Sequence, residues 1–115
     1  MTKDKPTVAI FGLGYVGLTL SVALADSGYD VIGIEPRQKD ISSLRKGIPH
    51  IHEKNLSGLL KKYVHKRIKL FSHSDKIQAD IYIVAVGTPV DGKKAPRLDY
   101  IEAVARSIGK IIKPN

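Results

Sequence analysis

Three glycines and one glutamate in this chain have the types and the spacing that a nucleotide site requires. Gly12, Gly14 and Gly17 follow the apolar run TVAIF in the order G-x-G-x-x-G, and a helix-like pattern follows them. The first glycine allows a sharp turn, the second lets the backbone approach a pyrophosphate, and the third lets a helix pack closely on a strand. The unpaired N–H groups and the partial positive charge at the start of that helix favour an anion. The stretch therefore predicts a phosphate-binding loop.

Glu35 stands 18 residues after Gly17, directly before Pro36. A dinucleotide site needs an acceptor for the adenosine ribose at the end of the second strand, about 20 residues beyond the glycine loop. A carboxylate there accepts hydrogen bonds from both ribose hydroxyls and repels a 2′-phosphate, which favours NAD over NADP. Arg37 argues the other way, because an arginine can hold a 2′-phosphate, and a solvated strand-end residue is the alternative interpretation of Glu35. We expect Glu35 to bind the ribose and NAD to be the cofactor.

Strand-like and helix-like segments alternate along the chain. The predicted strands cover residues 7–11, 30–35, 68–71 and 80–86. The predicted helical segments run from Tyr15 to Ser27, from Pro36 to about Leu44, along the stripe Leu56, Leu59, Leu60 and Tyr63, and from Asp99 onward. In the first of these we expect Val16, Leu20, Ala23 and Leu24 to form the buried face.

This alternation is typical of parallel strands joined by helical crossovers. It predicts an α/β fold, a Rossmann-type doubly wound parallel sheet with helices on both faces. The pattern stops after the helix that follows the fourth strand. We therefore expect residues 1–115 to be one N-terminal dinucleotide-binding domain, cut from a longer chain.

The loop after the fourth strand, VGTPVDG, contains the hydroxyl of Thr88 and the rigid Pro89. It follows a strand that we expect beside the first strand, at the crevice where open α/β sheets bind their ligands. From the residues alone, a ligand-contacting loop and a plain Gly-Thr-Pro turn are equally good interpretations.

Composition excludes several other classes of function. The 115 residues contain no cysteine, which excludes disulfides, thiolate metal sites and a cysteine nucleophile within this chain. The four histidines lack ligand-like spacing, so no metal site is predicted. The net charge is +8, and the densest basic stretch, Lys61 to Lys69, places Tyr63, Val64 and Ile68 as packing positions among solvated charges. We expect no nucleic-acid partner, no membrane contact and a cytoplasmic location.

Four segments resemble one known family. GLGYVGL at 12–18, GIE at 33–35, GIPHIHEKNLSGLL at 47–60 and VAVGTPVDG followed by LDYIEAVARSI are similar to the start of the UDP-glucose/GDP-mannose dehydrogenase family. The likeness extends over nearly the whole chain. Members of that family oxidise the C6 hydroxyl of a nucleotide sugar twice, to a uronic acid, and reduce two NAD. The resemblance implies the NAD-binding part of a UDP-sugar dehydrogenase of polysaccharide precursor synthesis, which in full length is a homo-oligomer.

The resemblance also implies roles for matching positions. It assigns Glu35 to the ribose with Arg37 alongside, and Thr88 to the nicotinamide half of NAD. The residues implied around the pyrophosphate are Gly12, Leu13, Gly14, Tyr15, Val16 and Gly17. No catalytic residue is implied here, because the family's catalytic residues lie further along, so we expect this chain alone to be inactive. One departure is that Glu-Lys-Asn-Leu at 53–56 replaces the common Glu-Pro-Gly-Leu.

Two alternatives stay open at the level of sequence. The first is a dinucleotide-sensing regulatory module without chemistry, and the second is another NAD-dependent dehydrogenase of the same cofactor fold. The Thr88-Pro89 loop and the GIPHIHEKNL segment favour the nucleotide-sugar dehydrogenase over the sensor, because a sensor needs neither.

Overall fold

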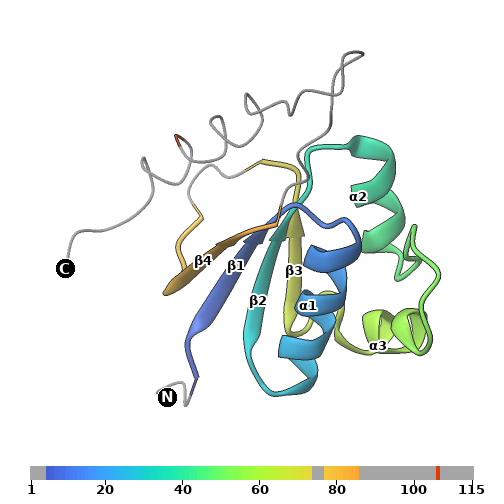
Figure 1. The fold of residues 1–115 in the computed structure, drawn as a ribbon, viewed down its shortest axis with the longest axis horizontal. Coiled ribbons are helices and arrows are strands. Elements are labelled where there is room, and N and C mark those ends of the chain that lie inside the picture. The colour runs from blue at the N-terminus through green and yellow to red at the C-terminus, as the bar shows by residue number, and fades with distance from the viewer. Residues whose placement is uncertain (1–4, 74–76, 86–105, 107–115) are drawn as a thin grey trace, which may run out of the picture.

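A parallel sheet of four strands organises the chain in the computed structural model, which describes residues 5–73, 77–85 and 106. The strands lie in the order β3-β2-β1-β4 (Figure 1). In chain order the elements are β1 (Thr7–Phe11), α1 (Tyr15–Asp26), β2 (Asp30–Ile34), α2 (Gln38–Arg45), α3 (Leu56–Tyr63), β3 (Ile68–Phe71) and β4 (Ile81–Val84). This order and the parallel pairing confirm the predicted Rossmann-type fold.

The predicted strands agree closely with the observed ones. β1 and β3 have the expected bounds, whereas β2 ends at Ile34, so that Glu35 follows the strand. Val8 pairs with Val31 and Ile81, and Ile10 pairs with Gly33 and Ile83, so these residues share one face of the sheet. The loop predicted from Gly87 and the helix predicted from Asp99 lie outside the described residues.

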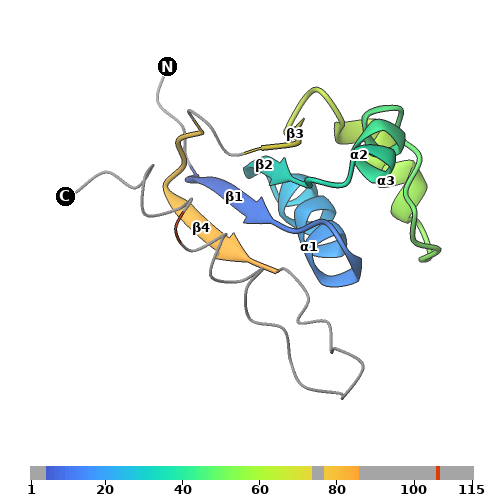
Figure 2. The same cartoon turned by 90° about the horizontal axis from the view of Figure 1, so that it is seen from above.

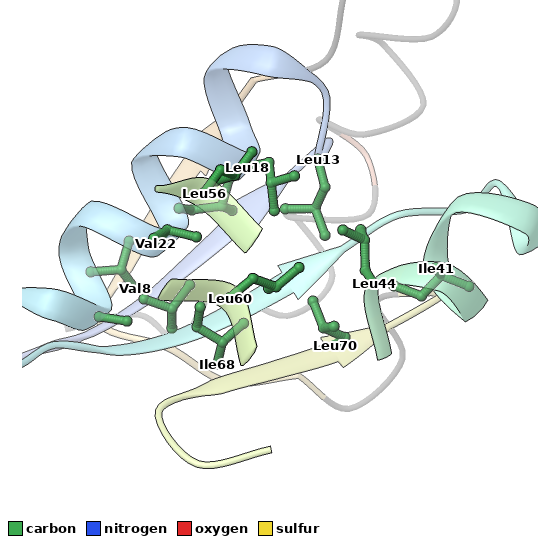
Figure 3. Close-up of a cluster of buried hydrophobic side chains, with 13 residues drawn as sticks. Val8, Leu13, Leu18, Val22, Ile41, Leu44, Leu56, Leu60, Ile68 and Leu70 are labelled. Carbon is green, nitrogen blue, oxygen red and sulfur yellow. The ribbon is translucent and has the colours of Figure 1, made fainter. Parts of the chain in front are cut away.

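All three described helices cover the same face of the sheet, as Figure 2 shows. Side chains from β1, β2, β3 and the helices form the main core between these layers. Its central members are labelled in Figure 3: Val8, Leu13, Leu18, Val22, Ile41, Leu44, Leu56, Leu60, Ile68 and Leu70. A second buried cluster lies on the opposite face and contains Ala9, Phe11, Ile34 and Ile77.

The predicted buried face of α1 was wrong. The helix buries Gly17, Leu18, Ser21, Val22 and Ala25. Val16 is 62% exposed, Ala23 is exposed, and Leu20 and Leu24 only border the core. Small residues at every fourth position let α1 approach the sheet closely, and Ser21 is tolerated there because its hydroxyl donates to the Gly17 carbonyl at 2.6 Å. Large apolar residues lie on both sides of α1, so their spacing alone does not single out the face that carries Gly17, Ser21 and Ala25.

The basic stretch packs as expected. Ile68 is buried, and Tyr63 and Val64 pack against the core, while the lysines between 61 and 69 are exposed. None of the described helices is long and apolar enough to cross a bilayer.

Candidate functional site

The glycine loop lies at the carboxyl end of β1, between that strand and α1. Gly12 has a φ of 96°, a conformation that side chains rarely adopt. Its N–H donates to the carbonyl of Ile34 at 2.9 Å, which ties the loop to the end of β2. The sharp turn predicted for Gly12 is therefore confirmed, and it points the chain directly into α1.

Gly17 permits the close contact between α1 and β1. A Cβ atom at this position would collide with the carbonyl oxygen of Gly12 and lie 2.9 Å from its carbonyl carbon. It would also lie 3.4 Å from the Cβ of Ala85, just beyond β4. The predicted packing role of Gly17 is confirmed. Gly17 is buried between α1 and the sheet, away from the surface that a ligand would contact.

Gly14 differs from the other two glycines because it faces open space. Apart from its chain neighbours and its own helix, a Cβ atom there would meet no atom of the described residues within 4 Å. Gly14 is the N-cap of α1, no side chain caps this end, and the first turn carries no acidic residue. The first turn of a helix carries N–H groups without helical partners and a partial positive charge. An uncapped and sterically open helix start of this kind fits the pyrophosphate of a dinucleotide.

Glu35 is buried and braces the glycine loop. Its side chain is 3% exposed, so the interpretation as a solvated strand-end residue is wrong. Oε1 accepts a hydrogen bond from the N–H of Leu13 at 3.1 Å, and Oε2 accepts one from the N–H of Arg37 at 3.0 Å. The backbone N–H of Glu35 donates to the carbonyl of Phe71 in β3 at 2.9 Å. One carboxylate thus connects the loop after β1 with the chain leaving β2.

The charge of Glu35 is balanced by Arg37. Nε of Arg37 lies 3.5 Å from Oε2 of Glu35, and Nη1 lies 3.7 Å from Oδ2 of Asp40. The arginine side chain is 71% exposed. Amide donors and an adjacent guanidinium compensate a buried carboxylate for the hydration that it loses. The carboxylate keeps further lone pairs, since each oxygen accepts more than one hydrogen bond.

The remaining predicted site residues divide into exposed and buried groups. Tyr15 is 57% exposed and Val16 is 62% exposed, both beside Gly14 at the start of α1. The side chain of Leu13 is fully buried in the core, and its N–H is donated to Glu35. Thr88 lies outside the described residues. The chain reaches it from Ala85, whose N–H donates to the carbonyl of Phe11 at 2.8 Å, so β4 ends beside the start of the glycine loop.

Sequence reasoning missed one electrostatic influence at this site, that of Glu53 on Tyr15. The Glu53 carboxylate raises the pKa of Tyr15, first by accepting a hydrogen bond from the hydroxyl and then by its negative charge. Glu53 belongs to the Glu-Lys-Asn-Leu segment that departs from the family pattern, and sequence reasoning assigned no role to that segment. The sequence offers only the two residue types, a phenol and a carboxylate far apart in the chain, and these do not predict that the side chains interact.

Metal chemistry finds no support in the described part of the chain. No group of three or more histidine, cysteine, aspartate or glutamate side chains gathers there in a way that could hold an ion.

The sequence profile of the UDP-glucose/GDP-mannose dehydrogenase family, NAD binding domain, matches residues 6–115. The chain belongs to this family. As its NAD-binding domain, it uses NAD as the cofactor.

Individual relatives agree with that assignment. The chain is 34% identical over 107 residues to UDP-N-acetyl-D-mannosamine dehydrogenase of Escherichia coli strain K12, covering 93% of this chain and 25% of the relative. It is 36% identical over 110 residues to NDP-N-acetyl-D-galactosaminuronic acid dehydrogenase of Ralstonia nicotianae, and this match covers 96% of this chain and 26% of the relative. The solved structure of the UDP-D-ManNAc dehydrogenase of Pyrococcus horikoshii superposes with a TM-score of 0.84 at 30% identity. The superposition covers 92% of this chain and 26% of that structure's chain. The chain thus spans about a quarter of the length of these relatives.

Proposed function

We propose that this family member is the cofactor-binding part of a dehydrogenase that oxidises the C6 hydroxyl of a UDP-sugar to a uronic acid. The family membership supports the use of NAD, and the names of the relatives support a nucleotide sugar as the substrate. Conversion of the alcohol to the carboxylate removes two hydride equivalents, consumes one water and reduces two NAD. The observation that carries the proposal is the open, uncapped start of α1 at Gly14, held by the buried Glu35.

The residues of this chain have separate tasks in the proposed complex. The amides at the start of α1 bind the pyrophosphate, with Gly14 leaving room for it and with Tyr15 and Val16 beside it. The carboxylate of Glu35 fixes the loop and offers its remaining lone pairs to the adenosine ribose hydroxyls. Its negative charge repels a 2′-phosphate, which gives the preference for NAD. When bound, NAD supplies the hydride acceptor.

Two further residues have proposed roles at the cofactor. Thr88 contacts the nicotinamide half of the cofactor, and Arg37 lies alongside the ribose. The catalytic residues, the sugar-binding region and the contacts of a homo-oligomer belong to other parts of the protein. The domain formed by residues 1–115 therefore binds NAD without oxidising a UDP-sugar. Steady-state assays of the purified chain with NAD and a UDP-sugar should show no NADH formation, and turnover above the no-enzyme blank would contradict this division of labour.

Calorimetry of NAD binding tests the proposal, because Gly14→Val fills the open space at the start of α1. We expect at least a tenfold loss of NAD affinity, roughly 1.4 kcal/mol or more. Gly58→Val is the matched control, since Gly58 lies in α3 and a Cβ atom there would also meet no described residue outside its own helix within 4 Å. The control should bind NAD like the wild type, and both variants should stay folded by circular dichroism. Equal NAD affinity in wild type and Gly14→Val would exclude the phosphate role of the loop.

A further inference from the structure

Arg37 opposes the cofactor preference that Glu35 gives to the site. An arginine beside the ribose can hold a 2′-phosphate, because its planar guanidinium donates two parallel hydrogen bonds to phosphate oxygens. In this chain the guanidinium already has carboxylate neighbours. Its Nε lies 3.5 Å from Oε2 of Glu35, and its Nη1 lies 3.7 Å from Oδ2 of Asp40. Two of its three nitrogens are therefore next to carboxylate oxygens in the free chain.

Asp40 is held more firmly than the arginine beside it. The Arg37 side chain is 71% exposed, whereas the Asp40 side chain is 19% exposed. Asp40 lies in the first turn of α2, where the N–H of Ile41 donates to the carbonyl of Arg37 at 3.0 Å. Ile41 and Leu44 are fully buried and attach this helix to the main core (Figure 3). The Asp40 carboxylate thus has a defined place, to which the long arginine side chain adjusts.

The charges of these three side chains do not cancel. Glu35 and Asp40 together carry two negative charges, and Arg37 carries one positive charge. A 2′-phosphate brings further negative charge and needs a cation whose donors are available. With Glu35 as its only carboxylate neighbour, Arg37 would balance that charge and keep more of its donors for a phosphate. Asp40 adds a second carboxylate to the same guanidinium.

We propose that Asp40 is a positioning residue for cofactor choice, which holds the Arg37 guanidinium between two carboxylates and away from a 2′-phosphate. This role rests on the proposed function, in which the Glu35 carboxylate binds the adenosine ribose. Asp40 does not need to touch the cofactor, because its effect passes through Arg37. NAD carries no 2′-phosphate and gains nothing when the arginine is released.

Calorimetry of Asp40→Asn with NAD and NADP tests this role. The substitution keeps the shape of the side chain and removes its charge. NADP affinity should rise about two- to fivefold, the range for an exposed charge pair, while NAD affinity changes by less than about twofold. Asp40→Glu keeps the charge and should keep the wild-type ratio of NAD to NADP affinity. In an Arg37→Ala background, Asp40→Asn should give no gain in NADP affinity, because the cation through which it acts is absent.

Asp30→Asn is the matched control. Asp30 is the first residue of β2, at the opposite end of that strand from Glu35. Its Oδ1 lies 3.6 Å from Nη1 of Arg67, so it also pairs with an arginine, at a similar distance. The substitution changes the net charge of the chain by the same amount as Asp40→Asn. It should leave the ratio of NAD to NADP affinity as in the wild type.

Three outcomes would overturn the inference while leaving the proposed function intact. They are an unchanged ratio in Asp40→Asn, an equal change in Asp30→Asn, which would indicate an effect of net charge alone, and a gain that persists without Arg37, which would indicate direct repulsion by Asp40. If the wild-type chain itself bound no NAD, the proposed function would fail instead. Thermal unfolding shows whether each variant is folded. Asp40→Ser, which also removes the charge, replaces Asp40→Asn if the asparagine variant is unfolded.

Discussion

Glu35 accepts a hydrogen bond from the backbone N–H of Leu13 at 3.1 Å, across the gap between the second strand and the glycine loop. The same carboxylate is 3% exposed and also accepts the N–H of Arg37. The residue expected to recognise the ribose is therefore also a structural brace of the loop that meets the pyrophosphate. Loss of this side chain affects the two halves of the adenosine diphosphate site together.

Glu35→Ala should lower both stability and cofactor affinity. Removal of the carboxylate leaves the buried N–H of Leu13 without its acceptor, which costs about 1–3 kcal/mol in the free energy of unfolding. NAD affinity should fall roughly 10- to 150-fold, the equivalent of about 1.5–3 kcal/mol for hydrogen bonds to a charged acceptor. The preference for NAD over NADP should shrink, because the repulsive charge is gone and Arg37 remains.

Two measurements on the Glu35 variants separate these effects. Urea unfolding gives the stability change, and calorimetry with NAD and NADP gives the affinities. Glu35→Gln is the informative comparison, since its amide can accept from only one of the two N–H groups and should fall between the wild type and Glu35→Ala. A Glu35→Ala variant that keeps the original ratio of NAD to NADP affinity would show that Glu35 does not reach the ribose.

Gly17→Ala should destabilise the fold, because its Cβ has no room against the Gly12 carbonyl group. Separation of α1 from β1 by a methyl group costs about 1–3 kcal/mol, the range for overpacked sites. Gly58→Ala provides the opposite case in α3, where a Cβ would meet none of the residues that the structure describes beyond its own helix within 4 Å. There the better helix propensity of alanine should stabilise the chain by up to about 1 kcal/mol. The free energy of chemical unfolding should therefore fall for Gly17→Ala and rise for Gly58→Ala. Equal changes in the two variants would contradict the close contact at Gly17.

Tyr15 should ionise at a higher pH than a tyrosine in a peptide. The Glu53 carboxylate raises the pKa of Tyr15 above the ordinary value of 10.0, so the folded chain favours the neutral hydroxyl. Any stability from this contact is present below that pH and is lost as the pH rises through the raised pKa. Tyrosinate absorbance of the wild type minus that of Tyr15→Phe isolates this titration. Glu53→Ala should move its midpoint to lower pH, and an unchanged midpoint would mean that the two side chains do not meet.

Local patterns in the sequence predicted most of the fold. TVAIF and IKLF are short apolar or alternating runs between breakers, and both strands have their predicted bounds. The structural roles of Gly12 and Gly17 were also predictable. A sharp turn excludes a side chain at Gly12, and close helix packing excludes one at Gly17. The buried face of α1 was not predictable from apolar size, because Leu18 is buried whereas the equally large Leu20 only borders the core.

The contacts that join separate elements could not be predicted in the same way. The position of Glu35 was found from its spacing to the glycines, but its hydrogen bond to Leu13 depends on how the loop folds back over β2. The influence of Glu53 on the pKa of Tyr15 joins the segment before α3 to the start of α1. No local pattern in the sequence predicts that these two separate segments come together.

The central claim is that the start of α1 binds the pyrophosphate of NAD, and a titration of the amide NMR spectrum with NAD tests it most directly. NAD should cause saturable shifts of the amide signals of Gly14, Tyr15 and Val16, and the amide signal of Gly58 in α3 should stay unchanged. Gly14→Val should abolish those shifts. Saturable shifts confined to other parts of the chain, or none at all, would contradict the assignment of this loop as the cofactor site.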